Sequence, residues 1–281
     1  MTRMYQTLTD VGCGVILLQD IDPILLLQPA LSFVIATAIL LYWWRTRSFR
    51  AVALFLGAGS YFIAIAAKEV INVTEYGDMV STFGAQSVPV ALLLGLETVL
   101  LEVGLAYLFA VYGAKTRGMK VSDAVPYGIG LAFWENGVLV GVLSVFNLGV
   151  VYLILLSSSP LAATVYQQLQ SSSPGLFLPP VSLLPGILLG TLERVSSEMA
   201  HVAWGILVAL SAVSGKKKYL AFALPMGLLD ALVPFASYNI YVFEGGVFLL
   251  SAGFLFVAAK SLSTESRAMK VAATAGTPVS A

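Results

Sequence analysis

Residues 187–213 read ILLGTLERVSSEMAHVAWGILVALSAV, an apolar run long enough to cross a ~30 Å hydrocarbon core, which takes about 20 helical residues. Four ionisable side chains nevertheless lie inside this run: Glu193, Arg194, Glu198 and His201. An ionisable group at the centre of a membrane helix costs roughly 2.5–3.5 kcal/mol, so such groups normally face a protein interior and often mark a site. The stretch therefore predicts a membrane-spanning helix with a polar face turned toward a site.

The composition of the whole chain is that of an integral membrane protein. Of its 281 residues, 58% are hydrophobic and 11% are charged, whereas soluble domains carry about 25% charged residues. We expect a multi-pass protein of the cell membrane, with the lipid bilayer as its first partner. The basic residues have no aromatic interleaving, so nothing supports a nucleic-acid partner. With one cysteine, Cys13, no disulfide can form within the chain.

Seven apolar spans fit between four basic clusters, and we place them at 23–44, 52–73, 88–113, 124–146, 187–213, 219–237 and 240–261. The clusters end spans one, three, five and seven; they are Arg45, Arg47 and Arg50; Lys115, Arg117 and Lys120; Lys216, Lys217 and Lys218; and Lys260, Arg267 and Lys270. Basic residues gather on the cytoplasmic side of membrane proteins. The fold class that follows is an all-α, seven-helix bundle with the N-terminus outside and the C-terminus in the cytoplasm.

The segments outside the spans complete the domain organisation. We expect an external N-terminal segment at 1–22, one membrane domain at 23–261, and a disordered cytoplasmic tail at 262–281, which is rich in Ser, Ala, Thr and Gly. Residues 147–158 are apolar and end at a Ser-Pro break, so they either extend span four or lie in the interface. We expect an external loop at 166–175.

Ten ionisable residues fall within the proposed spans: Lys68, Glu69, Glu97, Glu102, Glu135, Glu193, Arg194, Glu198, His201 and Asp230. Facing lipid, they would together cost on the order of 20 kcal/mol, more than the ~5–15 kcal/mol stability of a typical fold. They must therefore meet one another, reach a cavity, or lie at the boundary. We expect Lys68 and Glu69 to reach the boundary, because they lie near the outer end of span two.

Helical geometry places three polar groups of span five together. At 100° per residue, Arg194, Glu198 and His201 fall within about 60° on one face, whereas Glu193 lies to the side. The Glu198 and His201 pair repeats the Glu-x-x-His spacing with which helical bundles bind metals. The alternative is a structural network, in which Arg194 pairs with Glu198 or another buried acid and His201 bonds a neighbouring helix.

Two carboxylates from other spans lie at a depth similar to that of His201. Glu135 is in the middle of span four, and Asp230 follows Pro225, which can open a turn of span six. With His201 they could form a hydrolytic centre, in which one group holds water and another acts as a base. Alternatively, Glu135 is a hydrogen-bonded neutral acid and Asp230 caps the broken turn. In span three, Glu97 and Glu102 face about 140° apart, and we expect Glu102, the deeper one, to line the cavity.

Three short motifs carry a family resemblance. Gly130-Leu131-Ala132-Phe133-Trp134-Glu135, then Glu193-Arg194 followed by His201, then Met226-Gly227-Leu228-Leu229-Asp230 resemble the ordered motifs of the YhfC-type intramembrane metallopeptidases. These proteins are grouped with the type II CAAX prenyl proteases and bacteriocin-processing proteins, and are related to the seven-span scaffold subunit of γ-secretase. The resemblance covers about residues 50–262, and it implies peptide-bond hydrolysis within the membrane.

The resemblance also assigns roles to residues, with two departures. Glu135, His201 and Asp230 stand where the family has its span-four glutamate, its span-five histidine and the acid of its His-x-x-x-Asp motif. Leu131 and Met226, however, stand where the family has histidines. Zinc held by three protein nitrogens cannot form with one histidine in the chain, although one divalent metal ion on a mixed set of His201, Glu135, Glu198 and Asp230 remains open.

Three functions follow as alternatives. The first is a peptidase-like enzyme with Glu135, His201 and Asp230 as catalytic residues, supported by Glu193, Arg194, Glu198 and Glu102, in a cavity bounded by spans three to six. The second is an inactive relative that serves as a scaffold or binds a membrane protein or peptide. The third is a proton- or cation-coupled transporter with a relay of buried carboxylates.

Overall fold

The computed structural model describes residues 21–46, 49–157 and 159–274. These ranges contain helices and no strands, and seven helices are long and apolar enough to cross a membrane. The predicted all-α fold with seven spans is therefore confirmed. Cys13, most of the expected N-terminal segment and residues 275–281 lie outside the described residues.

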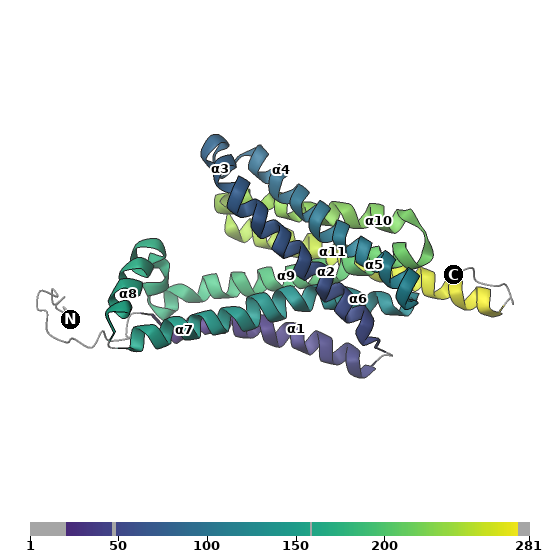
Figure 1. Ribbon diagram of the computed structural model, residues 1–281, viewed down its shortest axis with the longest axis horizontal. Helices are drawn as coiled ribbons and strands as arrows, with labels where there is room; N and C mark the ends of the chain where they lie inside the picture. The colour runs from purple at the N-terminus through teal and green to yellow at the C-terminus, as the bar shows by residue number, and fades with distance from the viewer. Residues whose placement is uncertain (1–20, 47–48, 158, 275–281) are drawn as a thin grey trace, which may run out of the picture.

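Each of the seven spans contains the predicted apolar run, and spans two, four and seven continue about ten residues beyond its predicted end (Figure 1). Span one consists of η2 (Pro23–Leu26) and α1 (Leu27–Thr46), and span two of α2 (Ala51–Ile71), η3 (Asn72–Tyr76) and α3 (Gly77–Phe83). Span three consists of α4 (Val88–Glu97), η4 (Thr98–Val103) and α5 (Gly104–Arg117). Span four consists of η5 (Val121–Asp123), α6 (Ala124–Ala132), η6 (Phe133–Leu143) and α7 (Ser144–Leu156). The helix α8 (Pro160–Ser172) and the short η7 (Pro174–Phe177) follow. Spans five to seven are α9 (Pro180–Ser214), α10 (Lys217–Ala223) with η8 (Leu224–Tyr238), and α11 (Ile240–Thr274).

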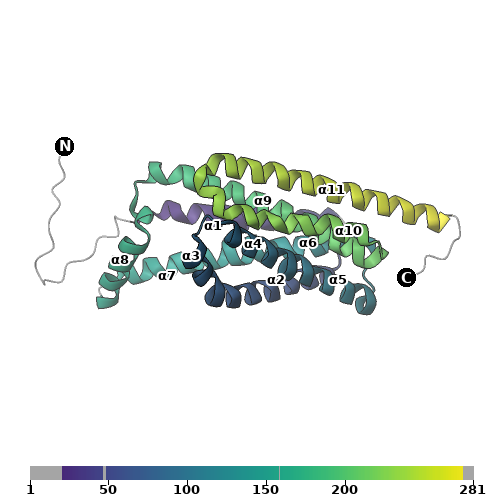
Figure 2. The same cartoon turned by 90° about the horizontal axis from the view of Figure 1, so that it is seen from above.

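The centre of the bundle is α6, whose residues are all buried. It packs between α2 and α9, with α11 and α2 on opposite sides of the molecule (Figure 2). Glycines permit the close approach on both faces of α6. A β-carbon on Gly130 would lie 2.1 Å from the carbonyl oxygen of Leu54 in α2, and one on Gly128 would lie 2.6 Å from that of Val202 in α9. Small residues at helix contacts let membrane helices pack backbone to backbone.

The stretch after span four departs from the loop that the sequence predicts. Residues 144–156 continue span four as α7, which settles the position of 147–156 in favour of an extended helix. The chain then turns and forms α8, so most of the expected 166–175 loop is helical. Pro160 is the first residue of α8, a position where the missing N–H of proline costs no hydrogen bond.

The expected disordered tail is also helical over the part that is described, because α11 continues to Thr274. The reason is an anchor at Glu265, whose side chain is buried although it lies beyond the apolar run. Lys216 Nζ lies 2.6 and 2.8 Å from the two carboxyl oxygens of Glu265, and the hydroxyl of Tyr219 donates a hydrogen bond to the same group. The contacts tie the end of span seven to the start of span six, so 262–274 is ordered as helix.

Four spans change their helical form in their interior, and in span two the π-helical segment η3 contributes no residue to the cavity described below. Span three is π-helical at η4, span four is π-helical at η6, and span six is a 3-10 helix along η8, which contains Pro225 and Pro234. A π-helical segment turns the residues that follow it relative to a regular α-helix, and such segments frequently occur at functional sites. In this protein η4 holds Thr98 and Glu102, η6 holds Glu135, and the 3-10 segment η8 holds Asp230.

Candidate functional site

Polar side chains from six helical segments surround one cavity of about 170 Å³. Charged and polar lining residues come from α2 (Lys68), η4 (Glu102), η6 (Glu135), α9 (Glu193, Arg194, Ser197 and His201), η8 (Asp230) and α11 (Ser251). The expectation that spans three to six bound the cavity is therefore incomplete, since α2 and α11 also contribute. Apolar side chains, among them Ile65, Leu229 and Val247, fill the rest of the wall.

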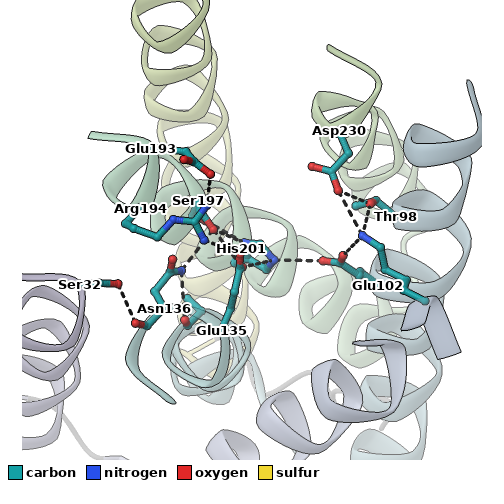
Figure 3. A network of polar contacts seen from close by, with 12 residues as sticks. Ser32, Thr98, Glu102, Glu135, Asn136, Glu193, Arg194, Ser197, His201 and Asp230 are labelled. Carbon is teal, nitrogen blue, oxygen red and sulfur yellow. Dashed lines mark hydrogen bonds and ion pairs between the residues drawn. The ribbon is translucent and has the colours of Figure 1, made fainter. Parts of the chain in front are cut away.

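His201 is at the centre of the network (Figure 3). Its Nε2 lies 2.8 Å from Glu135 Oε2 and 3.1 Å from Glu102 Oε2. Its Nδ1 lies 2.8 Å from the backbone oxygen of Ser197, one helical turn earlier. The rings of Trp204 and Tyr61 enclose the imidazole, with ring centroids at 4.1 and 5.2 Å. The side chain is thus held between two carboxylates and two aromatic rings.

The partners of His201 determine where its protons lie. The carbonyl oxygen of Ser197 can only accept, so Nδ1 donates to it. On the other side, Nε2 faces two carboxyl groups, which repel each other unless a proton lies among the three groups. That proton is on Nε2, giving an imidazolium ion, or on a carboxyl group that donates to Nε2. In both cases the lone pair of Nε2 is already used.

Glu135 is bonded by three residues of α9. Besides His201, Arg194 Nη1 lies 3.2 Å from its Oε1, and the hydroxyl of Ser197 donates to its Oε2 at 2.9 Å. Arg194 also pairs with Glu193. The expectation that Arg194 pairs with a buried acid is confirmed for Glu135, and Glu198 is not that acid.

A second group of contacts surrounds Lys68. Its Nζ lies 2.6 Å from Glu102 Oε1, 2.8 Å from Thr98 Oγ1 and 3.3 Å from Asp230 Oδ2. The hydroxyl of Thr98 also donates a hydrogen bond to Asp230. Lys68 does not reach the membrane boundary as the sequence suggests, because α2, η3 and α3 form one helix from 51 to 83 that puts residue 68 near its middle.

The structure brings together some of the predicted site residues and separates others. Glu135 and His201 are in direct contact, whereas Asp230 lines the same cavity and connects to His201 only through Lys68 and Glu102. Glu102 lines the cavity as expected. Glu198 is buried, but it does not line the cavity and makes no hydrogen bond to Arg194, His201 or Glu135.

Sequence reasoning missed several members of the network, among them Lys68, Thr98 and Ser197. The signal for Lys68 was the cost of an ammonium group in an apolar run, which pointed to a buried partner as readily as to the boundary. Ser197 lies four residues before His201, the spacing at which side chains share a helical face. Thr98 gave no signal, because hydroxyls are common in membrane helices.

The donor groups do not fit a hydrolytic zinc centre. Such a centre takes three protein ligands and a water molecule. Among the residues that the structure describes, no three His, Cys, Asp or Glu side chains form a group that could hold a metal ion. The proposed set of His201, Glu135, Glu198 and Asp230 is not assembled, and the ammonium of Lys68 and the guanidinium of Arg194 already neutralise carboxylates of the network.

Comparison with known proteins gives the family. The model of the YhfC intramembrane metalloprotease family matches residues 31–249, a range that contains Glu135, His201 and Asp230. The chain belongs to the YhfC intramembrane metalloprotease family. No curated protein and no solved structure matched the chain. In this YhfC-family protein, Leu131 and Met226 are buried in the hydrophobic core, where they pack with their apolar neighbours.

Proposed function

We propose that this YhfC-family protein binds a membrane-embedded peptide in its polar cavity and does not hydrolyse it through a zinc centre. The family's description as intramembrane metalloproteases supports a peptide within the bilayer as the ligand. The engagement of His201 carries the rest of the proposal. A zinc ligand must offer the lone pair of a neutral imidazole, but both ring nitrogens of His201 are already committed to protein oxygen atoms.

Two further features support the loss of zinc chemistry. The imidazoles that the family motifs carry four residues before Glu135 and Asp230 are replaced here by Leu131 and Met226, whose side chains are apolar and buried. Metal binding needs deprotonated ligands with free electron pairs, and it competes with any cation that already neutralises them. Lys68 is such a cation at Glu102 and Asp230.

The same groups suit a binding role. A peptide that enters the membrane leaves water, and each of its polar groups that finds no new partner costs several kcal/mol. Ordered polar groups inside the bilayer can replace water as hydrogen-bonding partners for its backbone and side chains. Charged side chains that are fixed by one another need little reorganisation when a ligand arrives. The cavity therefore offers hydrogen-bonding partners at a depth where lipid offers none.

Zinc stoichiometry tests the proposal directly. Purified protein in detergent is incubated with zinc, desalted and analysed for metal, beside His201→Ala and a Leu131→His/Met226→His double variant that restores both missing imidazoles. We expect the unchanged protein to hold no more zinc than His201→Ala, which should itself lose about 1–3 kcal/mol of stability because its partners are left unsatisfied. The double variant, if its melting curve shows that it folds, should gain zinc.

One zinc per chain in the unchanged protein, lost in His201→Ala, would overturn the proposal and favour a metallopeptidase. The double variant serves as the positive control for the assay. Its failure to fold would leave the comparison with His201→Ala intact.

A further inference from the structure

We infer that the cavity binds a peptide through a basic side chain, so that the ligand of this protein is a membrane-embedded segment with a lysine or arginine at cavity depth. The inference rests on the proposed function and names the ligand class of the same site. It comes from the charges, the unpartnered polar atoms and the size of the cavity.

The charge of the cavity is not balanced by the protein. Four carboxylates line it, from Glu102, Glu135, Glu193 and Asp230, and they face only Lys68 and Arg194 as full cations. Even with an imidazolium at His201, one negative charge is left over. An uncompensated charge is costly at low dielectric, so the cavity favours a ligand that carries positive charge.

Two of these carboxylates have room for such a ligand. The side chains of Glu102 and Glu135 are 3% and 14% exposed, whereas those of Glu193 and Asp230 are 44% and 41% exposed. Within the described residues, only Oε1 of Glu193 and only Oδ2 of Asp230 are engaged, by Arg194 and by Lys68 with Thr98. Figure 3 shows the two carboxylates on either side of His201, each with an oxygen that points away from its partners.

Two buried polar groups of the cavity wall point independently to a ligand with amide groups. Trp204 and Ser251 both line the cavity and are 3% and 0% exposed. In the part of the chain that is described, neither Trp204 Nε1 nor Ser251 Oγ has a hydrogen-bond partner. Buried polar groups are normally bonded, and an indole N–H can only donate. A peptide carbonyl is a suitable acceptor for the indole, and the serine hydroxyl can bond either group of an amide.

The volume of the cavity limits what enters it. Drug-sized ligands occupy pockets of about 300–1,000 Å³, whereas this cavity measures about 170 Å³. It therefore accommodates one long side chain with its adjoining backbone, and the remainder of the bound peptide stays in the lipid beside the bundle.

Binding of matched peptides tests the inference. The probes are two fluorescent 21-residue Leu/Ala peptides that differ at their centre, one with lysine and one with leucine, added to the full chain in dodecyl maltoside. We expect the lysine peptide to bind about tenfold more tightly, as for a charge-assisted contact. In Glu193→Gln/Asp230→Asn the preference should disappear. In Glu75→Gln/Asp78→Asn, a matched change at exposed carboxylates outside the cavity, it should persist.

The outcomes separate this inference from the proposed function. Equal binding of both peptides would overturn the basic ligand and leave peptide binding intact, whereas binding of neither would overturn both. Loss of the lysine preference when phosphatidylethanolamine is added would assign the site to an amine headgroup and overturn the peptide source. If Glu193→Gln/Asp230→Asn does not fold, Glu193→Gln alone should also lose the preference for the lysine peptide, because the Glu193 side chain is the most exposed of the four carboxylates.

Discussion

Arg194 holds the most demanding position among the charged residues, because a guanidinium cannot shed its charge in the membrane. Its side chain is only 15% exposed, and it forms ion pairs with two carboxylates, Glu135 across the helix interface and Glu193 beside it. The pair with Glu135 also fixes that carboxylate against His201. The orientation of the central imidazole therefore depends on Arg194, which it does not contact.

Replacement of Arg194 by leucine should destabilise the protein markedly. Glu135 would lose its guanidinium partner, and breaking a buried pair costs about 3–5 kcal/mol. We expect about 3 kcal/mol, since His201 and Ser197 still bond the carboxylate. In a detergent melting series this corresponds to roughly 5–10 °C.

A double change distinguishes the ion pair from lost packing. In Arg194→Leu/Glu135→Gln a neutral amide replaces the carboxylate that would otherwise lose its partner, so part of the lost stability should return. Strictly additive losses in the two single variants and the double variant would show that the pair contributes nothing of its own.

At the scale of the elements, the non-α segments decide the site. Thr98 and Glu102 lie in π-helical η4, Glu135 lies in π-helical η6, and Asp230 lies in the 3-10 segment η8. Helical wheels at 100° per residue grouped Arg194 and His201 correctly on α9. They also put Glu198 on that face and Glu193 to its side, which is wrong, because Glu193 lines the cavity and Glu198 does not. They could not place Lys68 against Glu102 and Asp230, because two of these three residues lie where the wheel does not apply.

The elements meet because glycines allow α6 to approach its neighbours. A β-carbon at Gly128 would lie 2.6 Å from the backbone oxygen of Val202 in α9, and backbone cannot move aside cheaply. Gly128→Ala should therefore cost about 1–3 kcal/mol and loosen the helix that carries His201. Gly186→Ala, in α9 with nothing within 4 Å of the added carbon, is the matched control and should be neutral or stabilising by up to ~1 kcal/mol.

Thermal melting of both variants measures the difference. Equal melting temperatures for Gly128→Ala and Gly186→Ala would mean that the α6–α9 contact is not limiting for stability.

At the scale of the molecule, the sequence predicted the spans better than their connections. Runs of apolar residues and basic clusters define a membrane span by length and charge alone, which is why all seven were found. The order of residues 262–274 could not be foreseen in that way, since it depends on a buried contact of Glu265 with Lys216 and Tyr219 from another span. The cavity likewise required knowledge of which helices are neighbours.

The orientation of the bundle in the membrane is the last prediction. Contacts link the basic clusters in pairs: Arg50 bonds the backbone oxygen of Arg117 at 3.0 Å, and Lys216 bonds Glu265 near the end of α11. The helix α8 lies at the opposite end of the molecule (Figure 1). Since basic residues stay in the cytoplasm, α8 should be external and the end of α11 cytoplasmic.

In a Cys13→Ser background, a membrane-impermeant maleimide should label Ser171→Cys in intact cells and Thr264→Cys only after permeabilisation. Both positions are exposed, so accessibility alone does not favour either one. The reverse pattern would invert the bundle and place the four basic clusters outside, against the charge rule that orients it.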